Sequence, residues 1–461
     1  MKLKNSVLAS YSIGGGIASS FGYNMMMVYF LVFSTDIMGI SGSAVGVIML
    51  ISRLVDTFTD PIMGAIADRT ATKWGRYRFW LLVSAPFLFI STYLVFASPN
   101  LLNQQSKFIY MLVMYVAFSI VYTIPNIAFH SLSSYLTDDT KERQKIVLSK
   151  QSVGQIAAFL VNAGGFYIIT RFGGGESGYR AMGFVFAIII TIGYILCAQG
   201  VKSIDTKERS YELKSKMNKK DGVSIWKSMT YIVKIPSMLA LSVASSTNTF
   251  ALAVTGAIGL YFYTHVMKNA AYFATASLAN TIAIALGYVV TFLLIKKYSN
   301  KNIFLYSSIL AIIPSVVLYY FFYDNPTWII GMLALSYGIT QVAFLATWMM
   351  VTDCADDIKY LTGESGDGIA SAGLNFSNKL GLALGGLFAG VFISKIGYQP
   401  NALSQSSEAI KGLIFAMTML PAIGNVFSVI AMKWYPINEE YHKNILSVIA
   451  SRDEVEEGNN K

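Results

Sequence analysis

The chain has 461 residues, of which 54% are hydrophobic and only 13% are charged. So little charge on so apolar a chain excludes an ordinary soluble protein and indicates a polytopic membrane protein. The formal net charge of +10 does not indicate a nucleic-acid partner, because the basic residues gather in loops on one side of the predicted spans.

Apolar runs of about 20 residues, the length that crosses a hydrocarbon core of ~30 Å, recur along the whole chain. We count twelve, beginning near Leu8, Ser43, Phe79, Phe108, Ser152, Ala181, Tyr231, Ala271, Ile303, Trp328, Ile369 and Ile410. They predict an all-α protein with twelve transmembrane helices. The first run is too long for a signal peptide and has no small-residue cleavage site after it, so we expect it to be retained.

Basic residues are unequally divided between the two sides of the predicted spans. Loops on the side of the N-terminus hold 27 of the 35 Lys and Arg residues, the opposite loops hold 6, and Arg53 and Lys379 lie within spans. The positive-inside rule therefore predicts a multi-pass protein of the cell membrane with both termini cytoplasmic. The same basic excess attracts anionic membrane lipid.

A polar, lysine-rich segment separates the first six spans from the last six. We predict an N-terminal half at 1–201, a cytoplasmic linker at 202–229, a C-terminal half at 230–436 and a cytoplasmic tail at 437–461. Six plus six spans with both ends on one side is the layout of transporters built from two parallel repeats around a site near the membrane midplane.

The second span carries three charged residues in its middle. Arg53, Asp56 and Asp60 lie at i, i+3 and i+7, which places them on one face of a helix. An ionised carboxylate in the membrane costs about 2.5–3.5 kcal/mol or more, so two of them need a cation, a proton or a basic side chain as partner. Pro61 removes a helix hydrogen bond beside the second carboxylate. An internal ion pair of Arg53 that only tightens the bundle is the alternative.

The fourth span carries a polar face. Tyr122, Asn126 and His130 follow one another at intervals of four residues, and their shared face also nears Thr123. Polar groups in a span tend to face water or protein, so we expect this face to line a cavity. The alternative is hydrogen bonding between helices, worth about 0.6–2 kcal/mol per contact.

The eleventh span combines polar residues with small ones. Asn375 and Lys379 lie in its first part, and both are expected in the solute site. We also expect Lys379 to pair with the Asp56 and Asp60 stripe, because its own helix offers no nearby acid. A lysine that extends to the membrane interface is the alternative. Two small-residue patterns that allow close helix packing follow, Gly381/Gly385 and Gly386/Gly390.

Nothing in the sequence indicates an enzyme. We find no nucleophile and base pair, no phosphate loop and no metal cluster around His130, His265 or His442. Cys197 and Cys354 are far apart in the chain and are expected to be buried free thiols. We therefore expect no cofactor and no metal site, and the expected ion is a co-transported Na⁺ or H⁺.

Several stretches together resemble a known family. RLVDTFTDPIMG at residues 53–64, WGRYRFW at 74–80, DCAD at 353–356 and GYQPNALSQS at 397–406 are similar to the glycoside-pentoside-hexuronide:cation symporters, the melibiose permease-like branch of the major facilitator superfamily. The resemblance covers nearly the whole chain. It implies a major facilitator fold that couples a sugar-type solute to Na⁺ or H⁺.

The resemblance also implies roles for single residues. Asp56 and Asp60 match the family's paired cation carboxylates, Thr123 a neighbouring cation-site hydroxyl, and Lys379 the lysine that faces them. The family's acidic, aromatic and basic sugar-binding residues are replaced, and the positions concerned are Ser20, Asn126, His130 and Gln151. The cation site is thus kept, whereas the usual sugar clamp is not.

These observations predict a secondary active transporter that works by alternating access. Oxygen ligands from Asp56, Asp60, Thr59 or Thr123 and Asn126 suit Na⁺, and a proton would suit the carboxylates too. Tyr122 is expected in the solute site, and Phe344 in the tenth span is expected to offer an aromatic face to a sugar, with Trp348 beside it; simple packing is the alternative.

The identity of the solute stays open at this point. The loss of acids near Lys379 and His130 makes a uronide or another anionic glycoside one candidate beside a neutral sugar. The alternative functions are an uncoupled facilitator and a transporter of a non-carbohydrate solute, either lipid-like or anionic.

Overall fold

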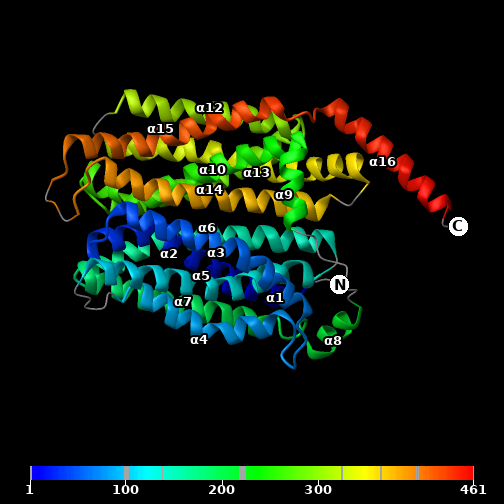
Figure 1. Ribbon diagram of the computed structural model, residues 1–461, viewed down its shortest axis with the longest axis horizontal. Helices are drawn as coiled ribbons and strands as arrows, with labels where there is room; N and C mark the ends of the chain where they lie inside the picture. Colours follow the sequence, from blue (N-terminus) through cyan, green and yellow to red (C-terminus); the bar gives the residue numbers. More distant parts are fainter. Residues whose placement is uncertain are drawn as a thin grey trace. The chain divides into compact units, whose positions relative to one another are not determined.

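The computed structural model describes residues 3–97, 103–137, 139–216, 225–322, 325–363, 366–400, 402 and 404–459. These residues form mainly α-helices (Figure 1). The helices are α1 (Asn5–Ala9), α2 (Gly16–Val32), α3 (Gly42–Arg69), α4 (Tyr77–Val95), α5 (Gln104–Tyr135), α6 (Thr140–Arg171), α7 (Gly175–Gly200), α8 (Lys207–Lys216), α9 (Ile225–Lys234), α10 (Pro236–Tyr261), α11 (Tyr272–Leu294), α12 (Asn300–Tyr320), α13 (Pro326–Thr362), α14 (Asp367–Lys395), α15 (Ser407–Ala431) and α16 (Glu439–Asn459).

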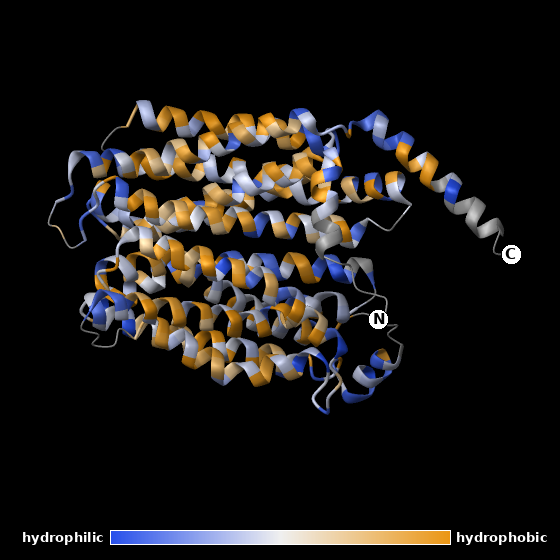
Figure 2. Ribbon diagram, viewed as in Figure 1, coloured by the Kyte–Doolittle hydropathy of each residue, from blue (hydrophilic) through white to orange (hydrophobic). Residues whose placement is uncertain are grey.

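Within the described residues, 12 helical segments are long and apolar enough to cross a membrane. Figure 2 shows apolar residues along their lengths and polar residues towards their ends. The prediction of twelve transmembrane helices is confirmed. Two helix boundaries differ from the predicted ones. α6 begins at Thr140, upstream of its apolar stretch. The helix predicted from Tyr231 is interrupted before Pro236, because a proline disfavours helical geometry in the residue that precedes it.

The chain packs into two compact units. Unit 1 holds Met1–Gly222, Gly256–Ser277 and Gly386–Ile410, and unit 2 holds Val223–Thr255, Leu278–Gly385 and Lys411–Lys461. The predicted division into halves at 201 and 230 stays a prediction. The predicted linker contains α8 and the start of α9, and its residues 217–224 lie outside the described residues.

In unit 1, α3 packs against α5, α4 packs against α5 and α7, and α2 packs against α6 and α7. The second small-residue pattern of α14, Gly386/Gly390, also belongs to unit 1. A Cβ atom added to Gly390 would lie 2.3 Å from the carbonyl oxygen of Gly42 at the start of α3, so only glycine lets the two backbones approach this closely.

A buried carboxylate fixes the start of α4. Asp205, which follows α7 and is fully buried, accepts hydrogen bonds from the backbone N–H groups of Arg76 at 2.7 Å, Tyr77 at 2.9 Å and Arg78 at 2.7 Å. The first N–H groups of a helix have no partner within the helix and carry its positive dipole end. Asp205 therefore ties the loop between α3 and α4 to the end of α7.

Unit 2 is held by the pair α12 and α13 and by close packing of α14 on α10. A Cβ atom added to Gly385 would lie 2.7 Å from the carbonyl oxygen of Phe250, and one on Gly381 would lie 2.3 Å from that of Ser246. Close packing of the Gly381/Gly385 pattern is thus confirmed. α16 packs on α13 through the buried residues Ile445 and Ile449.

Candidate functional site

Two carboxylates on α3 each meet a hydroxyl on α5. Ser119 Oγ donates to Asp56 Oδ1, and Thr123 Oγ1 donates to Asp60 Oδ1 over 2.9 Å. Both acids and both hydroxyls are four residues apart, so one turn of α3 faces one turn of α5. The result is two acid–hydroxyl pairs, one above the other, and we call these four residues the carboxylate ladder.

Most of the carboxylate ladder is shielded from solvent. Asp56 is 9% exposed, Ser119 is 7% and Thr123 is 4% exposed. Next to it, Thr59 Oγ1 is buried and has no hydrogen-bond partner among the described residues. An unpaired buried hydroxyl costs free energy, and here it lies within one residue of Asp60. Of the predicted cation-binding residues, the structure brings Thr123 into contact with Asp60, Thr59 precedes Asp60 in the chain, and Asn126 bonds to Ser19 instead. Ser119 was not predicted.

Arg53 provides one internal partner for the acids. Its Nη1 atom lies 3.2 Å from Asp56 Oδ2, and its guanidinium carbon lies 5.7 Å from the centre of the Tyr23 ring. Asp60 lies one turn further along α3 and bonds to Thr123. Arg53 therefore pairs with the first acid of the carboxylate ladder, as the sequence spacing predicted for an internal ion pair.

A polar wall continues from the carboxylate ladder along α5 towards α2 and α6. Ser19 Oγ donates to Asn126 Oδ1 at 2.8 Å, and Tyr122 Oη donates to the carbonyl oxygen of Ser19 at 2.6 Å. Ser20 Oγ donates to the carbonyl oxygen of Gly154 at 2.7 Å. Tyr122, Asn126 and Ser20 thus lie where three helices meet, while the Asn126 side-chain oxygen is already engaged by Ser19.

The wall ends in a basic pair that the sequence did not predict. Lys150 Nζ lies 3.1 Å from His130 Nδ1 and 5.7 Å from the centre of the Phe129 ring. No carboxylate lies within ion-pair distance of Lys150 in the described part of the chain. His130 is exposed, and so is Gln151, the residue that follows Lys150 on α6. Since lipid contact would be costly for these polar side chains, we expect them to face water or protein.

The tautomer of His130 is assigned from the positive charge of Lys150. A lysine ammonium only donates, so His130 Nδ1 accepts the hydrogen bond and the ring proton lies on Nε2. The pair therefore leaves ammonium protons and an imidazole N–H free to donate. Such a cluster of donors suits an anionic or hydroxyl-rich solute.

The remaining predicted site residues belong to unit 2. The rings of Phe344 and Trp348 lie edge to face, with centroids 6.5 Å apart, and Trp348 is 39% exposed. Asn375 is exposed and Lys379 is half-buried. The predicted pairing of Lys379 with the two acids joins unit 2 to unit 1 and stays a prediction.

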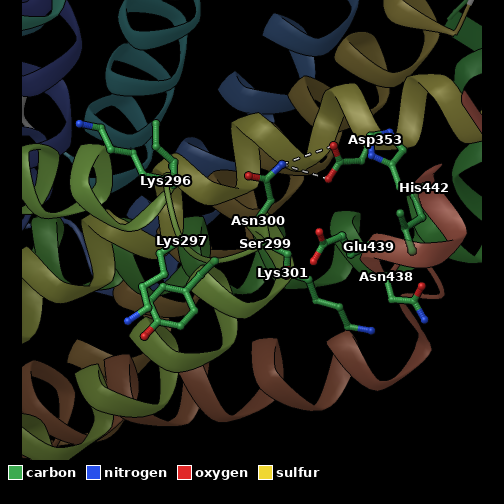
Figure 3. A pocket seen from close by; sticks show the side chains of 12 residues that line it. Lys296, Lys297, Ser299, Asn300, Lys301, Asp353, Asn438, Glu439 and His442 are labelled. Atoms are coloured by element: carbon green, nitrogen blue, oxygen red, sulfur yellow. Dashed lines mark hydrogen bonds between the residues drawn. The ribbon is translucent and has the colours of Figure 1, made fainter.

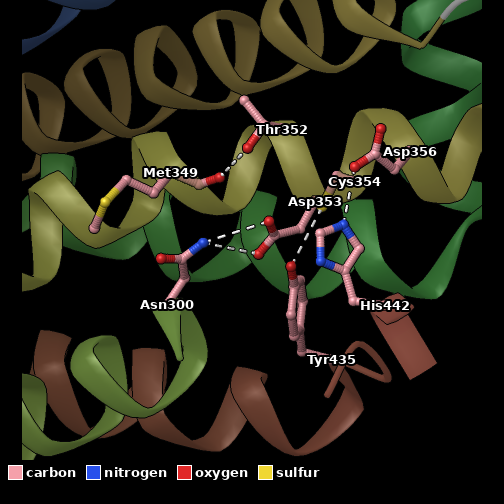
Figure 4. A network of polar contacts seen from close by, with 8 residues as sticks. All are labelled: Asn300, Met349, Thr352, Asp353, Cys354, Asp356, Tyr435 and His442. Atoms are coloured by element: carbon pink, nitrogen blue, oxygen red, sulfur yellow. Dashed lines mark hydrogen bonds and ion pairs between the residues drawn. The ribbon is translucent and has the colours of Figure 1, made fainter. Parts of the chain in front are cut away.

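A second polar cluster lies at one end of unit 2, and the sequence singled out only its DCAD stretch. Asp353 accepts from Asn300 Nδ2 at 3.1 Å, and His442 Nε2 lies 2.9 Å from Asp356 Oδ2 (Figure 4). Asp357 is buried and accepts from Ser237 at 2.5 Å and from Tyr441 at 3.2 Å. Burial, together with the charge of Asp357, raises the pKa of Tyr441, so its phenol keeps the proton it donates. These bonds dock α16 onto the end of α13.

A cavity of about 350 Å³ opens beside this cluster. It is lined by the turn between α11 and α12, by Asp353 and by the segment that enters α16 (Figure 3). All of these residues belong to unit 2, so the cavity is distinct from the carboxylate ladder.

The chain is similar over almost its whole length to known transport proteins. The family model of the MFS/sugar transport proteins matches residues 11–439. The isoprimeverose transporter of Lactiplantibacillus pentosus is 26% identical over 433 residues, which are 93% of this chain and 88% of that protein. The inner membrane symporter YicJ of Escherichia coli is 27% identical over 95% of this chain and 93% of its own length.

Three further similarities concern a longer relative and two solved structures. The raffinose carrier protein of Pediococcus pentosaceus is 25% identical over 94% of this chain and 71% of its own length. The solved structure of the nucleoside transporter NupG superposes with a TM-score of 0.66 at 15% identity and covers 94% of this chain. The inward-open structure of the xylose transporter XylE of E. coli superposes with a TM-score of 0.62 at 14% identity. These structures bear on the fold alone.

Proposed function

Because the chain belongs to the MFS/sugar transport family, a family of transporters and not of enzymes, we propose that it is a cation-coupled symporter for a sugar or glycoside. It would work by alternating access in the cell membrane, with both termini cytoplasmic, as the charge distribution predicts. The names of relatives that carry isoprimeverose and raffinose support a glycosidic solute.

The observation that carries the coupling is the carboxylate ladder. Asp56 and Asp60 with Ser119 and Thr123 present only hard oxygen atoms, the ligand type that alkali and alkaline-earth cations prefer. Arg53 Nη1 lies 3.2 Å from Asp56 Oδ2, and this one guanidinium carries a single positive charge beside two carboxylates, so Na⁺ or H⁺ would add to the balance of charge. The unpartnered hydroxyl of Thr59 would supply a further oxygen ligand.

Coupling between cation and solute would follow because the cation and Arg53 both interact with Asp56. A cation that binds at the carboxylate ladder competes with Arg53 for Asp56, and the freed guanidinium can turn towards the polar wall at Tyr122. Cation and solute would each raise the affinity for the other by the same factor. The predicted partnership with Lys379 would extend the same exchange to unit 2.

The test is uptake into proteoliposomes that contain the purified protein. A panel of radiolabelled glycosides, pentosides and uronides is offered under an imposed Na⁺ or H⁺ gradient, with Asp56→Asn beside the wild type. Gradient-driven accumulation that the substitution abolishes supports the proposal and identifies solute and ion. Equilibration without accumulation in both proteins would indicate an uncoupled facilitator, and no flux of any sugar would indicate a non-carbohydrate solute.

The basic pair at the end of the polar wall favours an anionic glycoside such as a uronide as the solute. Lys150 lacks a carboxylate partner among the described residues, and His130 adds a free N–H donor. A carboxylate on the solute would complete a charge-assisted hydrogen bond worth about 1.5–3 kcal/mol. The resemblance implies that Ser20 and Asn126 stand where relatives carry acidic residues. Without those acids, an anionic solute would meet less electrostatic repulsion in this region.

Lys150→Gln is therefore expected to weaken competition by uronates about 10-fold to 100-fold, while competition by neutral glycosides changes less than about threefold. The measurement is inhibition of uptake of one labelled solute by each competitor. Lys150→Arg keeps the charge and should retain most uronate affinity, and Lys145→Gln, five residues earlier on α6, controls for charge loss. Equal weakening for neutral and anionic competitors would contradict the anionic assignment.

A further inference from the structure

A half-buried acid at the end of the first spanning segment is held by a distant part of the chain. Asp36 lies in the π-helical turn Phe33–Ile37 that follows α2. Its Oδ1 atom accepts a hydrogen bond from Thr35 Oγ1 at 2.7 Å, and its Oδ2 atom accepts one from Tyr398 Oη at 2.9 Å. Thr35 and Tyr398 are both buried. The carboxylate therefore joins the end of α2 to the segment after α14.

Two residues at and just after the end of α10 extend this network. Tyr261 Oη and Thr35 Oγ1 lie 2.6 Å apart, and His265 Nε2 lies 3.0 Å from Tyr398 Oη. The ring of Tyr261 also packs edge to face against the ring of Tyr398, with centroids 4.8 Å apart. All of these residues belong to unit 1. We call the five residues the Asp36 cluster, and they are Thr35, Asp36, Tyr261, His265 and Tyr398.

The hydrogen bonds of the Asp36 cluster converge on one charge. An ionised carboxylate only accepts, so Thr35 and Tyr398 both donate to Asp36. Each hydroxyl has a single proton, so Thr35 in turn accepts from Tyr261. For the same reason Tyr398 accepts from His265 Nε2. Burial, together with the charge of Asp36, raises the pKa of Tyr398, so its phenol keeps the proton it donates. Two chains of donors thus end on the same carboxylate.

The loop that carries Tyr398 is shaped by its own contacts. Gly397 has a φ of +71°, a conformation that glycine adopts more readily than other residues. The backbone N–H of Gln399 donates to Gln405 Oε1 at 3.0 Å, and Gln405 Nε2 donates to the carbonyl oxygen of Gln399 at 2.7 Å. The loop belongs to the stretch 397–406 that carries part of the family resemblance. Its internal bonds present Tyr398 to the end of α2 on a preformed turn.

Further contacts within unit 1 join early and late parts of the chain. The backbone N–H of Ser43, at the start of α3, donates to Ser394 Oγ near the end of α14 at 2.9 Å. Met27 in α2 packs against Gly256 in α10, where an added Cβ atom would lie 2.6 Å from Met27 Cε. Each of these contacts, like the Asp36 cluster itself, joins a segment before residue 201 to one after residue 230. In a transporter built from two halves, such contacts must part when this end of the pathway opens.

We propose that the Asp36 cluster is a latch that holds the solute pathway closed at the end of α2 that is remote from the N-terminus. In the latched state, which the structure describes, donors at the end of α10 and after α14 close over the end of α2. When the latch opens, water replaces these donors around Asp36, and the contact between Met27 and Gly256 parts. The inference rests on the alternating access of the proposed function, but it concerns neither the solute nor the coupling ion.

The test measures opening of the latch without any solute. Met27→Cys places a thiol beside Gly256, at a position where the native side chain is 8% exposed. The rate at which this thiol reacts with a maleimide is measured in the detergent-purified full-length protein. Cys197 and Cys354 are buried, and the protein without the Met27 substitution gives their background rate. A thiol that reacts only in the open state reports the population of that state.

Variants of the Asp36 cluster connect the labelling rate to the latch. Tyr398→Phe keeps the ring but removes the hydrogen bond to Asp36, so we expect the labelling rate to rise about 10-fold or more. Asp36→Asn turns one acceptor of the cluster into a donor and should act in the same direction. His265→Phe removes one neutral donor and should raise the rate about fivefold. It is the second test if Tyr398→Phe does not fold.

The matched control removes a tyrosine hydroxyl elsewhere in unit 1. Tyr110 Oη, on α5, donates to the carbonyl oxygen of Leu94 on α4 at 2.6 Å. Both residues lie before residue 201, so this bond does not have to break when the latch opens. Tyr110→Phe should therefore change the labelling rate less than about twofold.

Two outcomes would overturn the proposal. An unchanged labelling rate in the folded Tyr398→Phe and His265→Phe proteins would make the Asp36 cluster a static contact. An equal rise in Tyr110→Phe would indicate general loosening of unit 1. The proposed function fails separately, because labelling that depends on the latch requires no cation-driven uptake. Intact uptake together with labelling that does not respond to the cluster would reject the latch alone.

Discussion

The Asp60→Asn variant is expected to lose gradient-driven accumulation of solute while it still exchanges solute for solute. Asp60 is the second acid of the carboxylate ladder, and Thr123 Oγ1 donates to one of its oxygens at 2.9 Å. An amide cannot take up a proton and binds a cation without charge attraction. The loss of one charged ligand corresponds to about 3 kcal/mol, or about 100-fold in cation affinity.

The measurement compares two assays on the same proteoliposomes. Uptake against a gradient requires net movement of the cation, whereas counterflow exchange requires only binding and reorientation. Thr123→Val removes one neutral donor and should weaken cation affinity only about fivefold, in line with a single hydrogen bond of about 1 kcal/mol. Asp367→Asn, an exposed acid at the start of α14, is the matched control. Full accumulation by Asp60→Asn would refute the assignment of the coupling site.

The sequence alone could predict one side of this site. The spacing of Arg53, Asp56 and Asp60 places them on one face of a single helix, and that periodicity is a local property. Ser119 escaped prediction because the register between α3 and α5 depends on packing, and serines are common in membrane helices for other reasons. One feature of the sequence could have indicated Ser119: it precedes Thr123 by four residues, the same interval that separates Asp56 from Asp60.

Lys150 escaped prediction for a different reason. Hydropathy places the start of the fifth span near Ser152, so Lys150 was counted among loop residues, whereas α6 begins at Thr140. A helix can extend beyond its apolar part, since backbone hydrogen bonding continues through polar residues in water. Lys150 therefore lies on α6, within hydrogen-bond distance of His130 on α5. The two residues are 20 positions apart in the chain, and the packing of α5 against α6 brings them together.

Long-range polar contacts lie furthest from what a sequence can predict. The stretch WGRYRFW at 74–80, which contains Arg76 and Arg78, was recognised as part of the family resemblance. Its partner Asp205 is more than 120 positions away, beyond four spans. The carboxylate lies in a segment whose composition predicts only a solvated linker. Its burial becomes visible once α4 and α7 are packed side by side.

Asp205→Ala is expected to be the most destabilising single substitution outside the carboxylate ladder. The carboxylate is 0% exposed and accepts from three backbone N–H groups at 2.7–2.9 Å. Its removal leaves three donors at the start of α4 without a partner in a buried place, and each hydrogen bond to a charged group is worth about 1.5–3 kcal/mol. Water can enter the space left by the carboxylate and replace some of the lost hydrogen bonds, so we expect a net loss of about 3 kcal/mol in the free energy of unfolding.

The measurement is the midpoint of thermal unfolding of the detergent-purified protein at one fixed scan rate, because unfolding of such proteins is commonly irreversible. Asp205→Asn keeps the shape and one acceptor oxygen, so its midpoint should fall by less than that of Asp205→Ala. Glu208→Gln, which removes an exposed acid three residues away, should leave the midpoint unchanged. If both Asp205 variants unfold like the wild type, the start of α4 is held by its packing on α5 and α7 alone, and the buried carboxylate adds no net stability.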